Sequence, residues 1–101
     1  MEILHKNPYG DEIYTLRVDI AKYQNGQTAI KLFDVADGFP YATASLAIDG
    51  VLQPDEVAIK NYSENEGVLH SLISAKVVAK PHRFKNQGYV QVPICKLLIT
   101  V

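Results

Sequence analysis

The fold of this chain is decided by the stretch Tyr41-Ala42-Thr43-Ala44-Ser45-Leu46-Ala47-Ile48-Asp49-Gly50. Apolar side chains at alternate positions, from Ala42 to Ile48, predict a β-strand with one buried face, because successive side chains of a strand point to opposite sides. The small Ala42 and Ala44 would let a helix approach that face closely. The Asp-Gly pair at its end predicts a turn, because both residues tolerate a positive φ angle.

Asx-Gly pairs recur through the first half of the chain. Asn25-Gly26 and Asp37-Gly38 precede Asp49-Gly50 at intervals of twelve residues. Turns at this spacing leave room for strands of ordinary length, which is typical of an antiparallel β-meander. The apolar patterns between and around them predict strands over residues 12–20, 27–35, 41–48 and 56–62.

The hydrophobic period changes after residue 62. Ser63-Glu64-Asn65-Glu66 fits a capping box, with Ser63 as N-cap, and an apolar stripe from Val68 to Ile73 follows helical spacing. A short strand is expected over residues 77–80, a turn at Asn86-Gln87-Gly88, and a final strand over residues 89–98, which would lie at an edge or contain a bulge because it includes Pro93. The sequence therefore predicts a single α+β domain over residues 1–101: an antiparallel β-meander of about five to six strands packed against one short amphipathic helix, about residues 64–75.

Composition limits the functional classes. The chain has 101 residues, of which 48% are apolar and 21% charged, as in an ordinary globular domain. No stretch is apolar for long enough to span a membrane, and the first residues lack the pattern of a signal peptide. Cys95 is the one cysteine and cannot form an internal disulfide. We therefore expect a cytoplasmic protein that is not bound to a membrane.

Charge is divided unevenly along the chain. Residues 1–66 hold all eleven acidic residues and five basic ones, whereas residues 67–101 hold the other five basic residues and no acid. The net charge of −1 conceals this division. If folding keeps the two groups apart, the surface has a negative side and a positive side, each able to steer a charged partner.

The residues that could carry catalysis or hold a metal do not form a familiar motif. His5, His70 and His82 lack neighbours at metal-ligand spacing, so we expect no metal, and no phosphate-binding loop or other cofactor motif is present, so we expect no cofactor. Cys95 lies in a strand-like stretch and is expected to act as a small buried hydrophobe. An active thiol assisted by His82 is the alternative. The sequence therefore favours a protein that is not an enzyme.

Two groups of residues are candidates for binding a partner. The basic segment 80–89 mixes cations with aromatic rings, which suits an acidic protein surface or a phosphate backbone but is also typical of a solvated hairpin. Carboxylates of the first half could instead bind a basic partner or imitate DNA phosphates. The basic candidates are Lys80, Arg83, Phe84, Lys85 and Tyr89, and the acidic candidates are Asp34, Asp37, Asp55 and Glu56.

Two blocks of the sequence resemble a known family. Gly38-Phe39-Pro40-Tyr41-Ala42-Thr43-Ala44-Ser45 and the later Val57-Ala58-Ile59-Lys60-Asn61-Tyr62-Ser63-Glu64-Asn65-Glu66-Gly67 are similar to segments of small uncharacterised proteins encoded by phages, plasmids and conjugative elements of gut-type bacteria. The resemblance covers roughly residues 27–98, and the chain departs from the family pattern at its helix entry, residues 63–67. It implies no catalytic residues. It implies a protein that acts stoichiometrically on host machinery.

These observations lead to one functional expectation and its alternatives. We expect a small binding protein of a mobile genetic element that docks on a host or mobile-element protein, such as a defence nuclease, and inhibits it, as anti-CRISPR and anti-restriction proteins do. The alternative is a nucleic-acid-binding accessory protein that uses the basic hairpin at residues 80–89. A homodimer formed through an exposed strand edge also remains open.

Overall fold

Antiparallel strands and one short α-helix make up the part of the chain that the computed structural model describes, residues 1–99. The strands are β1 (Glu2–Lys6), β2 (Ile13–Lys22), β3 (Thr28–Asp34), β4 (Pro40–Thr43), β5 (Ser45–Leu46), β6 (Glu56–Ile59), β7 (Arg83–Gln87) and β8 (Val90–Lys96), and the helices are the 3-10 helix η1 (Ser63–Asn65) and α1 (Val68–Ser74). This confirms the predicted α+β class. Residues 100 and 101, the last two of the apolar C-terminal stretch, lie outside the described residues.

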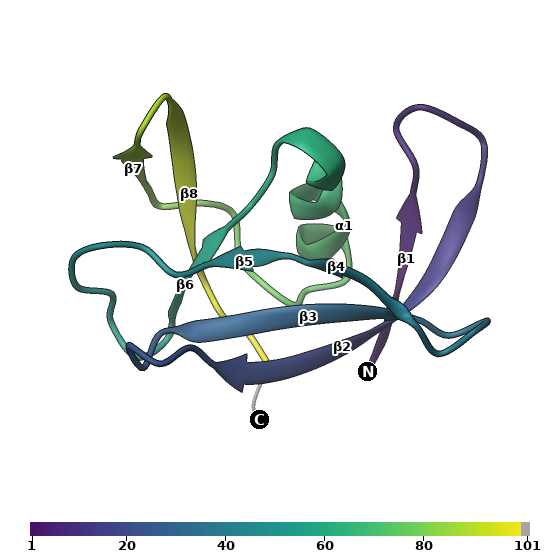
Figure 1. Ribbon diagram of the computed structural model, residues 1–101, viewed down its shortest axis with the longest axis horizontal. Helices are drawn as coiled ribbons and strands as arrows, with labels where there is room; N and C mark the ends of the chain where they lie inside the picture. Colours follow the sequence, from purple (N-terminus) through teal and green to yellow (C-terminus); the bar gives the residue numbers. More distant parts are fainter. Residues whose placement is uncertain (100–101) are drawn as a thin grey trace.

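The strands form two four-stranded sheets. Sheet A has the order β1-β2-β3-β4, and sheet B has the order β5-β6-β8-β7. Figure 1 shows that the two sheets bend around α1, with β1 on one side of the helix and β7 and β8 on the other. The helix therefore fills the opening between the two outermost strands, β1 and β7.

The two sheets meet at Ala44. Residues 41–48 do not form the single strand that was predicted, because β4 pairs with β3 whereas β5 pairs with β6. The Ala44 amide donates to the Ile30 carbonyl at 2.8 Å, and its carbonyl accepts from the Lys60 amide at 2.8 Å. Ala44 is fully buried, so its small side chain permits the bend at a position where a larger one would meet the core.

Ser45 completes this junction. The backbone amide of Ile30 donates to Ser45 Oγ at 2.8 Å, in place of the strand partner that it loses where the chain leaves sheet A. The Tyr23 hydroxyl lies 3.0 Å from the same oxygen. Because Ile30 is fully buried, its amide would be costly to leave without a partner.

The core lies between the concave faces of the sheets and α1. Leu16, Leu32, Ile59, Val68 and Leu72 are fully buried in one large cluster. A smaller cluster between sheet B and the loop before β6 contains Ile48, Val92 and Ile94. The helix meets the core because Val68 and Leu72 are one turn apart and share a face.

The helix begins differently from the prediction. Ser63 does not form a capping box; it has a positive φ angle of 54° and starts η1. The α-helix starts only after Gly67, whose φ of +88° turns the chain between the two helices, a conformation open to glycine at little cost. The amide of Leu69 is satisfied by the Asn61 side chain at 3.1 Å. An upstream residue thus performs the capping that the local motif was expected to supply.

Two strand predictions near the C-terminus are corrected. Residues 77–80 form only an isolated bridge, Val78 with Leu97, and Pro81 follows closely and has no amide to extend the pairing. Pro93 lies in β8, which is an interior strand between β6 and β7. The proline is tolerated because the pairing of β8 with β6 ends at Ile94. Pro93 lies just beyond this pairing, so its lack of an amide hydrogen removes no hydrogen bond to β6.

We expect the junction to control stability. Replacing Ser45 with Ala should lower the free energy of unfolding by about 1–2 kcal/mol, because the buried Ile30 amide loses its acceptor. Urea denaturation monitored by circular dichroism measures this change. Ser74→Ala, at an exposed position of α1, is the control and should change stability by less than about 0.5 kcal/mol. Equal losses in the two variants would contradict this account of the junction.

Candidate functional site

The basic candidate residues lie on or beside a β-hairpin. Strands β7 and β8 are joined by a turn of two residues, Gly88 and Tyr89, and Gly88 has a φ angle of +62°. A glycine with positive φ at the first turn position matches the twist of an antiparallel pair. The turn comes two residues later than predicted, since Asn86 and Gln87 still pair with β8.

Glu56 anchors the base of this hairpin. The residue is only 7% exposed, and both carboxylate oxygens accept hydrogen bonds from Arg83, from Nη2 at 2.9 Å and from Nε at 3.1 Å. His82 Nε2 lies 2.5 Å from Oε2, and the Gln53 amide donates to Oε1 at 2.8 Å. The Arg83 guanidinium, then the Gln53 amide and His82, lower the pKa of Glu56 to about 2. The carboxylate is therefore fully satisfied inside the protein.

Folding brings the acidic and basic halves of the chain together here. Arg83 binds Glu56, and Lys96 lies 3.8 Å from Asp55. The predicted separation into a negative side and a positive side is therefore not found at this end of the molecule. Lys85 is also engaged, because its Nζ donates to the Asp49 carbonyl in the loop before β6.

The other two acidic candidates stabilise a turn elsewhere. Asp34 Oδ1 accepts from the Ala36 amide, and Asp37 Oδ1 accepts from the Phe39 amide, both at 2.9 Å. These bonds are typical of Asx turns. They hold the connection between β3 and β4, which lies at the opposite end of sheet A from the loop that leads to β6 (Figure 1). The four acidic candidates therefore do not form one surface.

The remaining members of the basic segment are displayed to solvent. Phe84 is 58% exposed and Tyr89, at the tip of the turn, is fully exposed. Lys80 is exposed as well. Large aromatic side chains on a well-anchored hairpin are the type of residue that contributes most to protein–protein contacts.

Phe84 also lines a shallow groove between the hairpin and α1. The groove has a volume of about 330 Å³, and its lining also includes Tyr62, Leu69 and Pro81. Leu69 lies on the flank of α1 that faces sheet B. Sequence reasoning missed Tyr62 and Leu69, because they belong to the segment before and within the helix and meet the hairpin only in the folded chain.

Cys95 lies in the core. It is fully buried, and burial raises the pKa of its thiol to about 11. The thiol is therefore protonated at neutral pH, as expected for a small core residue. His82, its suggested partner, is bound to Glu56. Among residues 1–99, no three His, Cys, Asp or Glu side chains come close enough to hold a metal ion.

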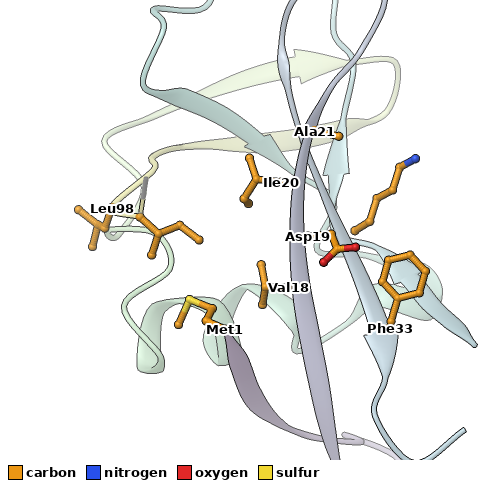
Figure 2. A pocket seen from close by; sticks show the side chains of 9 residues that line it. Met1, Val18, Asp19, Ile20, Ala21, Phe33 and Leu98 are labelled. Carbon is orange, nitrogen blue, oxygen red and sulfur yellow. The ribbon is translucent and has the colours of Figure 1, made fainter. Parts of the chain in front are cut away.

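A larger depression of about 800 Å³ lies where β2 meets the C-terminal segment. Figure 2 shows Met1, Val18, Ile20 and Leu98 on one side of β2, whereas Asp19 and Phe33 lie on the other. The lining residues are thus spread over two sides of the strand, and their polar groups do not converge on one point. A site for a small substrate would need such convergence.

Comparisons with protein-family models, with curated proteins and with solved structures give no match to this chain. The resemblance to proteins of mobile elements thus remains an expectation. Within the described residues, α1 is far shorter than a membrane-spanning helix must be.

The Glu56 cluster yields a stability prediction. Glu56→Gln should lower the free energy of unfolding by about 1–3 kcal/mol, because a buried acceptor of several charged hydrogen bonds is weakened. Asp55→Asn is the matched control and should change stability by less than about 0.5 kcal/mol, since Asp55 is exposed and 3.8 Å from its cation. Urea denaturation at neutral pH measures the change in the free energy of unfolding for both variants. A larger loss for the Asp55 variant would contradict the assignment.

The same carboxylate predicts a pH dependence. The pKa of Glu56 is lowered on folding from 4.5 to about 2, so its contribution to stability is complete above pH 4.5 and is lost as the pH falls toward 2. The stability difference between the wild type and Glu56→Gln should therefore shrink over this range. Denaturation curves at a series of pH values would show it. A difference that stays constant would exclude the ionised form as the stabilising one.

Proposed function

We propose that this protein is a non-enzymatic binding protein that acts stoichiometrically on a protein partner through its β7–β8 hairpin. The observation that carries the proposal is the exposure of Phe84 and Tyr89 on a hairpin whose base is anchored by Glu56. An anchored hairpin loses little conformational entropy on binding, so its exposed aromatic area is available for affinity. The groove beside Phe84 can accept a side chain of the partner.

The proposed partner is a bacterial defence nuclease in the host cytoplasm. This part of the proposal rests on the resemblance to small proteins of phages and plasmids, which supplies the biological context. The mechanism would be occlusion: the hairpin covers a surface that the nuclease needs, and Lys80 adds attraction to an acidic partner. No step of this mechanism requires catalysis by the protein.

The arrangement of the cations favours a protein partner over nucleic acid. Arg83 and Lys85 each bind an oxygen of the protein itself. A phosphate would have to compete with these contacts, which weakens the alternative of a nucleic-acid-binding hairpin. Titration of short single- and double-stranded DNA by fluorescence anisotropy tests this. Micromolar binding with a steep salt dependence would favour that alternative and contradict our proposal.

Phage plating provides the functional test. We expect the protein, expressed in bacteria that carry a CRISPR or restriction system, to raise the plating of a targeted phage at least about tenfold for the system that it inhibits. An inhibitor present at about ten times its Kd leaves only about a tenth of its target free. Replacing both Phe84 and Tyr89 with Ala should abolish the effect. Plating would be compared across a panel of defence systems, with expression checked by immunoblot.

Phe39→Ala is the matched control. Phe39 is an aromatic residue that is 68% exposed, but it lies in the connection between β3 and β4. This variant should keep full activity. Failure of the wild-type protein against every system of the panel would refute inhibition of a defence nuclease, and equal loss in the Phe39 variant would exclude the hairpin as the contact surface.

A further inference from the structure

The free edge of β1 is the strongest feature that the proposed function does not use. Strand β1 pairs with β2 on one side only, in the register that places Ile3 opposite Leu16 and His5 opposite Tyr14. The Val18 amide donates to the Met1 carbonyl, and the Asn7 amide donates to the Glu12 carbonyl. In an antiparallel pair the hydrogen-bonded residues alternate, so the odd-numbered residues of β1 face β2.

The even-numbered residues of β1 therefore direct their backbone groups away from the sheet. Within residues 1–99, no other strand pairs with the amides and carbonyls of Glu2, Leu4 and Lys6. Their side chains are exposed as well, and Leu4 is 67% exposed although it is a large apolar residue. An edge of this kind can accept an additional strand.

A groove lies between α1, the Leu4–Lys6 end of this edge and the loop that follows β1. Its lining includes Leu4 and Lys6 from β1, Tyr9 from the following loop, and His70, Ser71 and Ser74 from the helix. Ser71 Oγ lies 2.7 Å from Nδ1 of the buried His5, which ties the helix to the strand. The groove has a volume of about 920 Å³, which lies within the range of ordinary ligand pockets.

The charges along the edge select what can bind. Glu2 and Lys6 lie at its two ends with Leu4 between them. In an added antiparallel strand, the residue opposite Lys6 comes first, the residue opposite Leu4 follows two positions later, and the residue opposite Glu2 comes last. Opposite charges and apolar pairs in directly opposed positions stabilise a sheet, whereas like charges destabilise it. The favoured order is therefore acidic, any, apolar, any, basic.

We infer that β1 and α1 form a docking site for an extended segment of a partner protein, which adds to sheet A as an antiparallel strand with the pattern acidic-x-apolar-x-basic. Backbone hydrogen bonds to Leu4 and its even-numbered neighbours provide attachment, and the end charges provide direction. The side chains at the x positions of the added strand point to its other face, toward Ser71 and Ser74, so small polar residues are favoured at these positions. This site is separate from the β7–β8 hairpin and does not depend on its function.

A peptide titration tests the inference. The probe is acetyl-Thr-Glu-Thr-Leu-Thr-Lys-Thr-amide, and its control is the same peptide with Glu and Lys exchanged. We expect the probe to bind the full-length protein at least about tenfold more tightly than the control, because the exchange replaces two attractive charge pairs with two repulsive ones. Nuclear magnetic resonance titration up to millimolar peptide measures both affinities. The amides of Leu4 and Lys6 should show slower hydrogen exchange with the probe bound.

Two kinds of variant separate the contacts. Leu4→Pro removes the amide that faces the groove without removing a hydrogen bond to β2, whereas Leu4→Thr keeps that amide. The proline variant should therefore bind the probe at least about tenfold more weakly than the threonine variant. Exchanging Glu2 and Lys6 in the protein should reverse the preference between the two peptides. Circular dichroism would show that these variants remain folded.

Several outcomes would overturn the inference. They are no binding of the probe at millimolar concentration, equal binding of the two peptides, and equal binding by the proline and threonine variants. Strand β1 itself reads Glu-x-Leu-x-Lys, so sedimentation of the free protein is also required. A concentration-dependent dimer that Leu4→Pro abolishes would assign this edge to a second copy of the chain instead of a partner segment.

Discussion

The whole architecture depends on the backbone of Ala44 and Ser45, where one chain segment is shared by two sheets. Ala44 donates to β3 and accepts from the segment that follows β6, and Ser45 supplies the acceptor that Ile30 would otherwise lack. Buried backbone groups must be paired, so a strand can change sheets only where such replacements exist. This junction bends the sheets into the curved surface that encloses α1.

The position of α1 follows from that bend and determines both candidate surfaces. Sheets A and B end in β1 and β7, and the helix lies between them (Figure 1). Its apolar stripe enters the core, whereas its two flanks each face one terminal strand. Ser71 and Ser74 therefore line the groove beside β1, and Leu69 lines the groove beside β7. A single short helix thus contributes to two separate grooves, one beside each terminal strand.

Charge has a mainly internal role at the hairpin. The division of acids and bases along the chain indicated two oppositely charged sides, but Glu56 and Arg83 come from the two halves and bind each other. Pairing of this kind stabilises the base of the hairpin and leaves Phe84, in β7, and Tyr89, in the turn, as its exposed aromatic residues. This arrangement is the basis of our proposal that the hairpin contacts a protein.

The sequence by itself determined the local elements: the alternating strand at residues 12–20, the turns at Asn25-Gly26 and Asp37-Gly38, and the apolar stripe of α1, because each depends on neighbours in the chain. It did not predict β1, since the buried His5 and the exposed Leu4 invert the usual alternation. It also identified Phe84 and Tyr89 as candidates, but not that Arg83 would be bound by Glu56. Only the tertiary structure decided where Ala44 changes sheets and which charges meet, because those contacts join residues far apart in sequence.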